Sequence, residues 1–389
     1  MRFLQIHNRY QFYGGEDFVV ALESSLLSSC GDHEVQSYCI SNSEINSFFS
    51  KLGVFFSTPY SYKEKSRFRC FIRHFPDVAH VHNFFPLITP SVYDVCIESG
   101  IPVVQTLHNY RIICPGALLM RDEHICEQCL DGSPYQAVLY KCYRNSRLGS
   151  LAVARMVDYH RRRDTWNRKV DRFIALTEFA KSRFVKAGID PDKISVKPNF
   201  VPDPFPGGIT RTKRHGALFV GRLSVEKGIA TLARAWMRID YSLSVAGEGP
   251  ETDRLKNIPN ITKLGQVDSS FISDLMTASA FLVMPSEWYE GFPMVLVEAF
   301  AHGLPVITSC LGSMAEIVED GVTGLHFEPG DSEDLSEKVQ WMVDHPRQCQ
   351  AMGENARQVY LEKYTPEINY QILMQIYKEA IDARNSARS

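Results

Sequence analysis

The sequence predicts an α/β protein built from two doubly wound, parallel-sheet domains. Short apolar runs alternate with helix-like stretches along most of the 389 residues. Short runs with apolar residues on both faces suit strands in the interior of a parallel sheet that helices cover on each side. Eight such runs are Phe3–Ile6, Val78–Val81, Val103–Leu107, Phe173–Leu176, Ala217–Val220, Leu243–Ala246, Ala280–Met284 and Pro305–Ser309. Repeated strand–helix units are typical of doubly wound domains.

A domain boundary is predicted near the middle of the chain. The stretch Pro198–Gly208 is rich in Pro and Gly, and the polar stretch Thr210–His215 follows it. This composition is typical of an interdomain linker. We therefore expect an N-terminal domain over residues 1–203 and a C-terminal domain over residues 210–364.

The last segment, residues 365–389, is predicted to be a helix with one buried face. Thr365 followed by Pro366 is typical of a helix start, with an N-cap and a proline in the first turn. Apolar residues then recur at helical spacing, namely Ile368, Ile372, Leu373, Ile376, Tyr377 and Ala380.

Composition and charge exclude several classes of protein. Hydrophobic residues make up 44% of the chain and charged residues 22%, which excludes a disordered or fibrous protein. The balance of 42 Lys+Arg against 45 Asp+Glu gives a net charge of −3, which excludes a polycation that coats nucleic acid. The apolar runs are too short for a membrane span or a secretory signal. We therefore expect a cytoplasmic protein with reduced thiols.

The strongest site pattern lies between residues 281 and 309. A predicted strand leads into a loop that carries Glu290, and a helix beginning at about Pro293 carries Glu298. The two carboxylates would lie on the order of 10 Å apart, which suits an extended ligand with hydroxyl groups at both ends, such as a nucleotide sugar. Amides at the helix start would favour an anion between them. Alternatively, Glu290 is a solvated loop acid and Glu298 a helix-surface acid, although the apolar neighbours of Glu298 disfavour simple solvation.

A second pattern combines a glycine turn with two cations. Gly221 and Arg222 follow the predicted strand Ala217–Val220, and Lys227 and Gly228 close the loop. Arg222 can grip phosphate with two hydrogen bonds and Lys227 adds a compact charge, so the loop could hold a diphosphate without a metal ion. An ordinary surface loop with basic residues is the alternative.

Together these patterns resemble the family 4 retaining glycosyltransferases, which have the GT-B fold. The resemblance covers nearly the whole chain. In the C-terminal half it rests on Gly221-Arg222-x4-Lys227-Gly228, Gly247-Glu248-Gly249-Pro250, Glu290-x7-Glu298 and Gly303-Leu304-Pro305-Val306. In the N-terminal half it rests on Tyr13-Gly14-Gly15-Glu16, His82, His108 and Val196-Lys197-Pro198-Asn199-Phe200-Val201-Pro202.

The resemblance implies two Rossmann-like domains that face a cleft, with the last helix crossing back to the N-terminal, acceptor-binding domain. It implies retaining, metal-independent transfer of a hexosyl unit from a UDP- or GDP-sugar to a glycan or lipid-linked acceptor. Polysaccharide or glycolipid biosynthesis would be the setting. No cofactor is required for the catalysis so implied, and no nucleic acid is a partner.

The resemblance also assigns roles to individual residues. Arg222 and Lys227 would bind the diphosphate and stabilise the leaving group, Glu298 would hold the ribose, and Glu290 would contact the donor sugar. His108 would orient the sugar or the acceptor, whereas its spacing alone fits a buried structural histidine equally well. The implied catalytic set is His108, Glu290, Arg222 and Lys227. The implied donor-binding set is Gly14, Gly15, Gly221, Arg222, Lys227, Glu290, Gly291, Phe292, Pro293, Met294 and Glu298.

Four cysteines form a separate cluster in the N-terminal half. Cys126 and Cys129 form a CxxC pair, with Cys114 before it and Cys142 after it. Four thiolates at such spacing could hold a structural zinc ion. The alternative is four reduced thiols that only pack, and a redox role is disfavoured because no CxxC follows a strand at a helix start.

Two basic stretches raise the question of a membrane partner. Tyr62–Arg69 interleaves cations with aromatic residues, and Arg144–Lys169 interleaves arginines with apolar residues. Such segments are attracted to anionic membrane surfaces. We therefore expect either peripheral contact with the inner face of the cell membrane or ordinary solvated helix faces.

Three other functions compete with the transferase. A nicotinamide-dependent oxidoreductase is disfavoured because Gly247-Glu248-Gly249-Pro250 lacks the third glycine of the dinucleotide fingerprint. A nucleotide-sugar epimerase of the same fold would need no acceptor. A zinc-stabilised nucleic-acid-binding module would use the cysteines and basic stretches, but the paired donor motifs argue against it.

Overall fold

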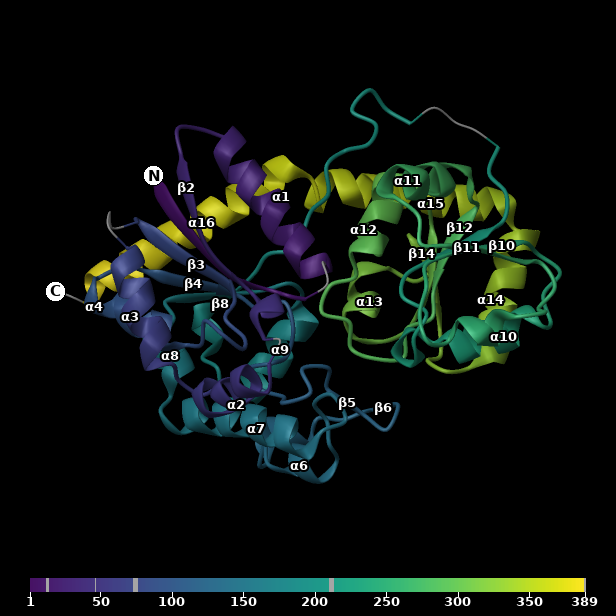
Figure 1. Ribbon diagram of the computed structural model, residues 1–389. Helices are drawn as coiled ribbons and strands as arrows, with labels where there is room; N and C mark the ends of the chain where they lie inside the picture. Colours follow the sequence, from purple (N-terminus) through teal and green to yellow (C-terminus); the bar gives the residue numbers. More distant parts are fainter. Residues whose placement is uncertain (12–13, 46, 73–75, 210–212, 388–389) are drawn as a thin grey trace. The chain divides into compact units, whose positions relative to one another are not determined.

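The chain forms two compact units (Figure 1). The computed structural model describes residues 1–11, 14–45, 47–72, 76–209 and 213–387. Unit 1 comprises Met1–Arg121, Cys126–Asn199 and Glu367–Ser389, and unit 2 comprises Asp122–Ile125 and Phe200–Pro366. Tyr13 of the predicted glycine motif, residues 210–212 of the predicted linker and residues 388–389 of the predicted last helix lie outside the described residues.

Unit 1 contains a six-stranded parallel sheet in the order β2-β1-β3-β4-β7-β8. Its strands are β1 (Arg2–Arg9), β2 (Glu34–Ser41), β3 (Val78–Asn83), β4 (Val103–Thr106), β7 (Arg172–Ala175) and β8 (Ile194–Val196). The order reverses between β1 and β3. A crevice forms at such a reversal, beyond the carboxyl ends of the strands, and ligands bind there in open α/β sheets.

Unit 1 also contains helices, and a small hairpin at residues 120–125 is divided between the two units. The helices are α1 (Gly15–Ser29), α2 (Phe48–Ser57), α3 (Tyr62–Phe71), α4 (Ser91–Glu98), α5 (Gln128–Asp131), α6 (Gln136–Leu139), α7 (Arg147–Arg162), α8 (Thr165–Lys169), α9 (Glu178–Lys186) and α16 (Pro366–Ser386). Strands β5 (Met120–Arg121) and β6 (His124–Ile125) pair with each other. Helix α16, yellow in Figure 1, packs on unit 1: its Tyr377 hydroxyl lies 2.8 Å from Nδ1 of His80, and its Arg384 pairs with Asp171 at 2.7 Å.

Unit 2 contains a second parallel sheet of six strands in the order β11-β10-β9-β12-β13-β14. Its strands are β9 (Ala217–Val220), β10 (Leu243–Ala246), β11 (Ile261–Gly265), β12 (Phe281–Met284), β13 (Val306–Ser309) and β14 (Gly324–Phe327). Its helices are α10 (Ile229–Trp236), α11 (Ser269–Ala278), α12 (Met294–Ala301), α13 (Gly312–Ile317), α14 (Ser332–Asp344) and α15 (Pro346–Lys363). Counted within the unit, this is the order 3-2-1-4-5-6 of a dinucleotide-type Rossmann sheet.

The predicted α/β class with two doubly wound sheets is confirmed. Each of the eight predicted strand runs coincides with one of strands β1, β3, β4, β7, β9, β10, β12 and β13. The other four strands of the two sheets, β2, β8, β11 and β14, are the sheet edges. An edge strand is covered less completely than a central one. The exposed positions along β2 show this, and they interrupt the continuous apolar run that identifies a central strand.

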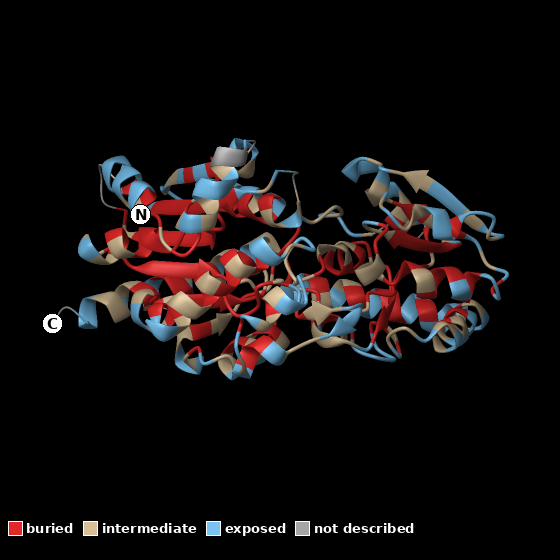
Figure 2. Cartoon of the chain, turned by 60° about the horizontal axis from the view of Figure 1, so that its bottom comes forward, coloured by how far each residue is buried: buried red, intermediate tan, exposed pale blue. Residues whose placement is uncertain are grey.

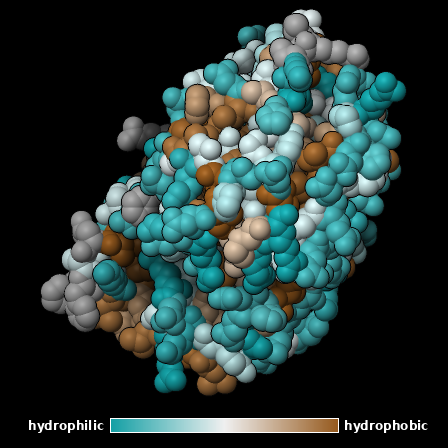
Figure 3. All heavy atoms as spheres, turned by 90° about the vertical axis from the view of Figure 1, so that its right-hand side faces the viewer, coloured by the Kyte–Doolittle hydropathy of each residue, from teal (hydrophilic) through white to brown (hydrophobic). Residues whose placement is uncertain are grey.

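Burial follows the layers of each unit. Figure 2 shows buried residues concentrated in the strands and on the inner helix faces, with exposed residues on the outer turns. The surface in Figure 3 is mainly hydrophilic, with separate hydrophobic patches. Among the described residues no helix combines the length and apolar character needed to cross a bilayer.

Candidate functional site

The predicted donor-binding residues of unit 2 lie where the strand order of its sheet reverses. Strands β9 and β12 are neighbours, with Phe281 paired to Ala217, although two other strands of the sheet, β10 and β11, lie between them in sequence. The loop 221–228 follows β9 and the loop 285–293 follows β12. The carboxyl ends of parallel strands meet at one edge, so both loops border the crevice at which such sheets bind ligands.

Close backbone packing at glycines holds these loops together. Gly228 has a φ of +68°, and a Cβ added there would lie 1.8 Å from the carbonyl oxygen of Pro285. A Cβ on Gly247 would lie 1.9 Å from the carbonyl oxygen of Gly221. Only glycine fits at such distances. The motif glycines at 228 and 247 are therefore required by the packing of the loops.

The two loops bring Lys227 and Glu290 into direct contact. Nζ of Lys227 lies 2.6 Å from Oε1 of Glu290, and the Ser286 hydroxyl donates to the same oxygen at 2.8 Å. The ammonium also lies 5.7 Å from the ring centre of Trp288. Glu290 is buried, with 7% of its side chain exposed, whereas 24% of the Lys227 side chain is exposed. The lysine thus compensates a buried carboxylate while remaining accessible to a ligand.

Arg222 differs from Lys227 because its side chain is exposed and forms no ion pair among the described residues. It directly follows Gly221, at the carboxyl end of β9. An arginine without a protein partner at this edge can turn both of its terminal amino groups toward an anion.

The remaining predicted donor-binding residues of this loop lead into α12. Pro293 is buried and occupies the N-cap position, so the helix begins at Met294. The carbonyl of Gly291 accepts a hydrogen bond from the Ser313 hydroxyl, and the Phe292 ring packs against Tyr364 at 6.2 Å. Early amides of a helix have no partner within it, so this turn presents donors to an anion or a sugar oxygen.

Glu298 lies one turn into α12 and is half-buried. Burial raises the pKa of its carboxyl above the usual range. The side chain has no hydrogen-bond or ion-pair partner among the described residues. A half-buried carboxyl group without a partner can accept hydrogen bonds from ligand hydroxyl groups, and these neutral donors bring no further charge into the site.

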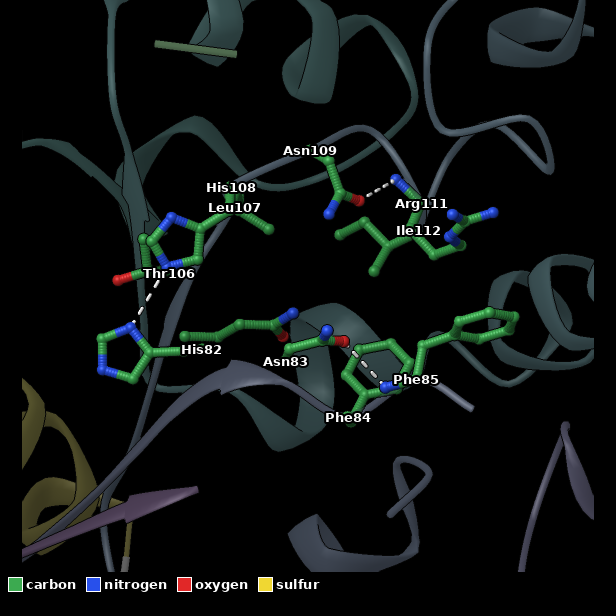
Figure 4. A pocket seen from close by; sticks show the side chains of 11 residues that line it. His82, Asn83, Phe84, Phe85, Thr106, Leu107, His108, Asn109, Arg111 and Ile112 are labelled. Carbon is green, nitrogen blue, oxygen red and sulfur yellow. Dashed lines mark hydrogen bonds between the residues drawn. The ribbon is translucent and has the colours of Figure 1, made fainter. Parts of the chain in front are cut away.

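In unit 1, His82 and His108 line a pocket at the carboxyl ends of β3 and β4 (Figure 4). The pocket is small and partly open to solvent. Nε2 of His108 lies 3.1 Å from Nδ1 of His82, and the rings are stacked with centres 5.4 Å apart. Burial lowers the pKa of His82 to about 3 and that of His108 well below the usual range, so both are neutral near neutral pH.

The N-terminal glycines are placed differently from those of unit 2. Gly14 precedes α1, and its amide donates to Oδ2 of Asp17 at 3.1 Å. Among the described residues, a Cβ on Gly14 would lie 4.0 Å from the nearest atom, and one on Gly15 would meet nothing within 4 Å. The protein's own packing therefore does not require glycine here. Open space at these positions is compatible with close approach of a ligand to the backbone.

The sequence predicted no functional role for several buried polar residues near this pocket. Glu23, His80 and Lys197 form a buried cluster that includes His82. Glu16 accepts a hydrogen bond from the Tyr10 hydroxyl at 3.0 Å. A signal for Glu23 was present, because it lies at helical spacing from the apolar residues Val19, Val20, Leu26 and Leu27 and therefore on the buried face of α1.

The four predicted zinc ligands lie in one region of unit 1. A Cβ on Gly116 would lie 3.8 Å from Sγ of Cys114 and 3.5 Å from Cβ of Cys142. Burial, followed by the proximity of the three other cysteines, raises the pKa of Cys129 to about 12. No three of these sulfur atoms lie within 4.8 Å of one another; among the described residues only Glu23, His80 and His82 bring three ligand atoms that close. The zinc site stays a prediction.

Two glycosyltransferase family profiles match successive parts of the chain. The profile "Glycosyltransferase Family 4" matches residues 43–203, and "Glycosyl transferases group 1" matches residues 208–359. An uncharacterized glycosyltransferase of Methanocaldococcus jannaschii is 32% identical over 171 residues, which is 42% of this chain and 48% of the relative. Glycogen synthase of Mycobacterium tuberculosis is 33% identical over 40% of each chain. The chain thus matches about half or less of the length of these relatives.

A longer match reaches an alpha-D-kanosaminyltransferase of Streptomyces kanamyceticus, which is 23% identical over 72% of this chain and 71% of that protein. Among solved structures, sucrose-phosphate synthase from Thermosynechococcus elongatus superposes with a TM-score of 0.70 at 16% identity, covering 98% of this chain and 99% of that chain. Anabaena Alr3699/HepE in complex with UDP superposes with a TM-score of 0.67 at 17% identity, covering 97% and 100%. Structural similarity at this identity shows the fold alone. The two profiles show that residues 43–203 and 208–359 are similar to family 4-type and group 1 glycosyltransferases, and the superpositions show the GT-B fold.

Proposed function

We propose that this protein is a retaining glycosyltransferase that moves a hexosyl unit from a nucleoside diphosphate sugar to a glycan or lipid-linked acceptor, in polysaccharide or glycolipid biosynthesis. The observation that carries the proposal is the meeting of Lys227 and Glu290 at the reversal point of the unit 2 sheet. A cation, a sugar-binding acid and a helix start share one sheet edge there. The structural neighbour from Anabaena has also been solved with UDP-glucose.

The ion pair suggests how the donor is received. A diphosphate that approaches the exposed Arg222 competes with Glu290 for the Lys227 ammonium. Once Lys227 turns to the phosphate, Glu290 is free to accept hydrogen bonds from hydroxyl groups of the donor sugar. Both cations then stabilise the negative charge that develops on the leaving nucleoside diphosphate, without a requirement for a metal ion.

Other residues complete the proposed donor site. Glu298 accepts the two ribose hydroxyls, which would supply partners to a half-buried carboxylate that has none among the described residues. Amides near Phe292 and Met294 hold sugar or phosphate oxygens, and the backbone at Gly14 and Gly15 approaches the phosphates. His108 orients the donor sugar or the acceptor hydroxyl.

Ligand-dependent thermal stabilisation tests the donor site. UDP, GDP and ADP, each alone and as a sugar conjugate, should stabilise the protein selectively. A ligand at about 100 times its Kd contributes roughly 2.7 kcal/mol. Arg222→Ala should abolish the shift. The matched control is Arg238→Ala, which removes another exposed cation of unit 2, one that pairs with Glu333 at 2.7 Å. No shift with any nucleotide, or equal shifts in both variants, would contradict the proposed site.

The stereochemistry and metal dependence need separate measurements. Proton NMR of the first-formed product should show the anomeric configuration of the donor, and turnover should be unchanged in excess EDTA. An inverted product would contradict the retaining mechanism. Loss of turnover that returns with added Mg²⁺ would contradict the assignment of charge stabilisation to Arg222 and Lys227 alone.

We further propose that unit 1 contacts the inner face of the membrane to reach a lipid-linked acceptor. Leu139, Tyr140 and Leu148 are exposed by 72%, 48% and 69%. The exposed cations Lys141, Arg144 and Arg147 lie in the same stretch. Apolar tips among cations suit an anionic bilayer surface. Co-sedimentation with phosphatidylglycerol vesicles at low salt should be lost in Leu139→Ser/Leu148→Ser, and a protein that stays wholly in the supernatant would contradict the proposal.

We also propose that Cys114, Cys126, Cys129 and Cys142 hold a structural zinc ion, with the sulfur atoms drawn inward on binding. Support comes from Cys114, whose sulfur accepts backbone hydrogen bonds from Leu119, Gly116 and Ala117; these bonds oppose the rise in its pKa that burial causes. Elemental analysis should find one zinc per chain, reduced in Cys129→Ser and retained in the control Cys96→Ser, which alters a buried cysteine outside the cluster. Zinc-free protein that also fails to bind Co²⁺ would contradict the site.

A further inference from the structure

The pocket histidine His108 is the end of a continuous polar chain that runs through the core of unit 1. Its Nε2 contacts Nδ1 of His82 at 3.1 Å, as Figure 4 shows. Nε2 of His82 in turn lies 3.3 Å from Oε1 of Glu23. The side chains of Glu23 and His82 are 1% and 0% exposed, so water does not compete for these contacts. Three elements, α1, β3 and the end of β4, supply the three residues.

Lys197 and His80 contact the Glu23 carboxylate from two sides. Nζ of Lys197 lies 3.3 Å from Oε2, and Nδ1 of His80 lies 2.9 Å from Oε1. Burial alone would raise the pKa of Glu23, but His80, Lys197 and His82 together lower it well below the usual range. Lys197 is itself fixed by Oδ1 of Asn369 at 3.0 Å. An ionised carboxylate only accepts hydrogen bonds, so it demands donors from its neighbours.

This demand determines where the protons lie on both ring systems. His82 is neutral and has one N–H. Its Nε2 lies 3.3 Å from Oε1 of Glu23, a contact too poorly aligned for a hydrogen bond, and has no hydrogen-bond partner among the described residues. The negative charge of the carboxylate beside this nitrogen favours the proton on Nε2. Nδ1 of His82 then holds a lone pair and accepts from Nε2 of His108. Neutral His108 consequently has its proton on Nε2 and a lone pair on Nδ1, the nitrogen that points away from His82 in Figure 4.

We propose that Glu23 and His82 are positioning residues that fix the tautomer of His108, so that its Nδ1 presents a lone pair to a substrate hydroxyl. The inference rests on the proposed function for its consequence in catalysis, but not for the tautomer itself. A substrate hydroxyl that donates a hydrogen bond to Nδ1 is oriented and made more nucleophilic. Nδ1 can accept this hydrogen bond because the ring proton lies on Nε2. A carboxylate that orients a catalytic ring through its far nitrogen acts by the same logic as the aspartate of a serine protease triad.

A metal site is the competing explanation for the same cluster. Glu23, His80 and His82 bring three ligand atoms within 4.8 Å of one another. However, the Lys197 ammonium already lies against the carboxylate, and His80 already uses both ring nitrogens, with Thr106 at 2.7 Å and Tyr377 at 2.8 Å. A divalent ion would add charge next to a buried cation, so the polar chain Glu23–His82–His108 fits the cluster better than a metal site.

The tautomer can be measured directly in the unaltered protein. Long-range ¹H–¹⁵N NMR of histidine-labelled protein distinguishes a protonated ring nitrogen from one with a lone pair. Both His82 and His108 should be neutral with the proton on Nε2 at pH 7. The resonances are assigned by their loss in His82→Gln and His108→Gln. A proton on Nδ1 of His108, or a doubly protonated ring, would overturn the proposal whether or not the protein is a transferase.

Kinetics of Glu23→Gln then test the catalytic consequence. We expect kcat to fall about 100-fold, within the range of acid–base effects, while the Kd of the donor nucleotide stays unchanged. Tyr377→Phe is the matched control, because it removes a hydroxyl from the same cluster but leaves the Glu23–His82–His108 chain intact. Equal kcat values in the two variants would overturn the positioning role. If Glu23→Gln does not fold, the NMR measurement on the unaltered protein still decides the tautomer. A protein that binds no nucleotide would instead contradict the proposed function.

Discussion

Replacing Glu16 by Gln should stabilise unit 1, and the gain should grow with pH. Glu16 lies in the first turn of α1, with 9% of its side chain exposed. Burial raises the pKa of its carboxyl to about 8, against opposing contributions that include the hydrogen bond from Tyr10. Gln keeps the acceptor oxygen and the approximate shape but cannot ionise. The substitution therefore removes a titration and leaves most of the packing in place.

The magnitude follows from the difference in proton binding between the folded and unfolded chain. The pKa is about 8 in the folded protein and 4.5 for an unperturbed carboxyl. Below pH 4.5 both states are protonated and Glu16 has no cost. Between these two pKa values only the folded state holds the proton, so its stability falls by about 1.36 kcal/mol per pH unit. From about pH 5 to about pH 7.5 the advantage of Gln should grow by ~3 kcal/mol.

The assay must report on unit 1 alone, because a protein with two units need not unfold in one step. Urea unfolding followed by hydrogen exchange of α1 peptides, read by mass spectrometry, meets this need. The exposed Glu44→Gln is the control and should show no pH-dependent gain. If Glu16→Gln changes the unfolding free energy equally at both pH values, the carboxyl is not held protonated and the reasoning is refuted.

Two further predictions concern the loops of unit 2. Lys227→Met leaves the buried Glu290 without its cation and should lower the unfolding free energy by about 1–3 kcal/mol. A second substitution, Glu290→Gln, should restore most of this loss. Additive effects of the two substitutions in a double-mutant cycle would contradict a direct pair. Gly228→Ala should lower the melting temperature by several degrees, because the new Cβ would lie 1.8 Å from the Pro285 carbonyl oxygen at a φ of +68°. In Gly15→Ala the new Cβ meets no atom of the described residues within 4 Å, so this variant should melt unchanged; equal melting of the two variants would refute the packing argument.

The sequence was most informative where burial was most complete. Central strands such as β3 and β12 are buried at every position, so β12 is apolar throughout and β3 begins with a largely apolar run. Edge strands such as β2 are exposed on part of their surface and lack this pattern. The glycines at 228 and 247 could also be identified from their motifs, because close backbone contact excludes every other residue there.

The state of each site residue, in contrast, depends on distant partners. The motifs nominated Lys227 and Glu290 separately, but only the adjacency of β9 and β12 pairs them at 2.6 Å. The spacing likewise left Arg222 and Lys227 equivalent, and the structure distinguishes an exposed arginine from a paired lysine.

The buried polar residues of unit 1 show most clearly what the sequence determines and what only the tertiary structure decides. The sequence by itself determined two parallel sheets, the loops that follow their strands and the residue types in those loops, because local composition and periodicity encode them. Only the tertiary structure decided that Glu23, His82 and Lys197 meet, since these residues come from separate elements. Charge and proton positions depend on distances of about 3 Å. Folding sets those distances between residues far apart in the chain, and no local pattern contains them.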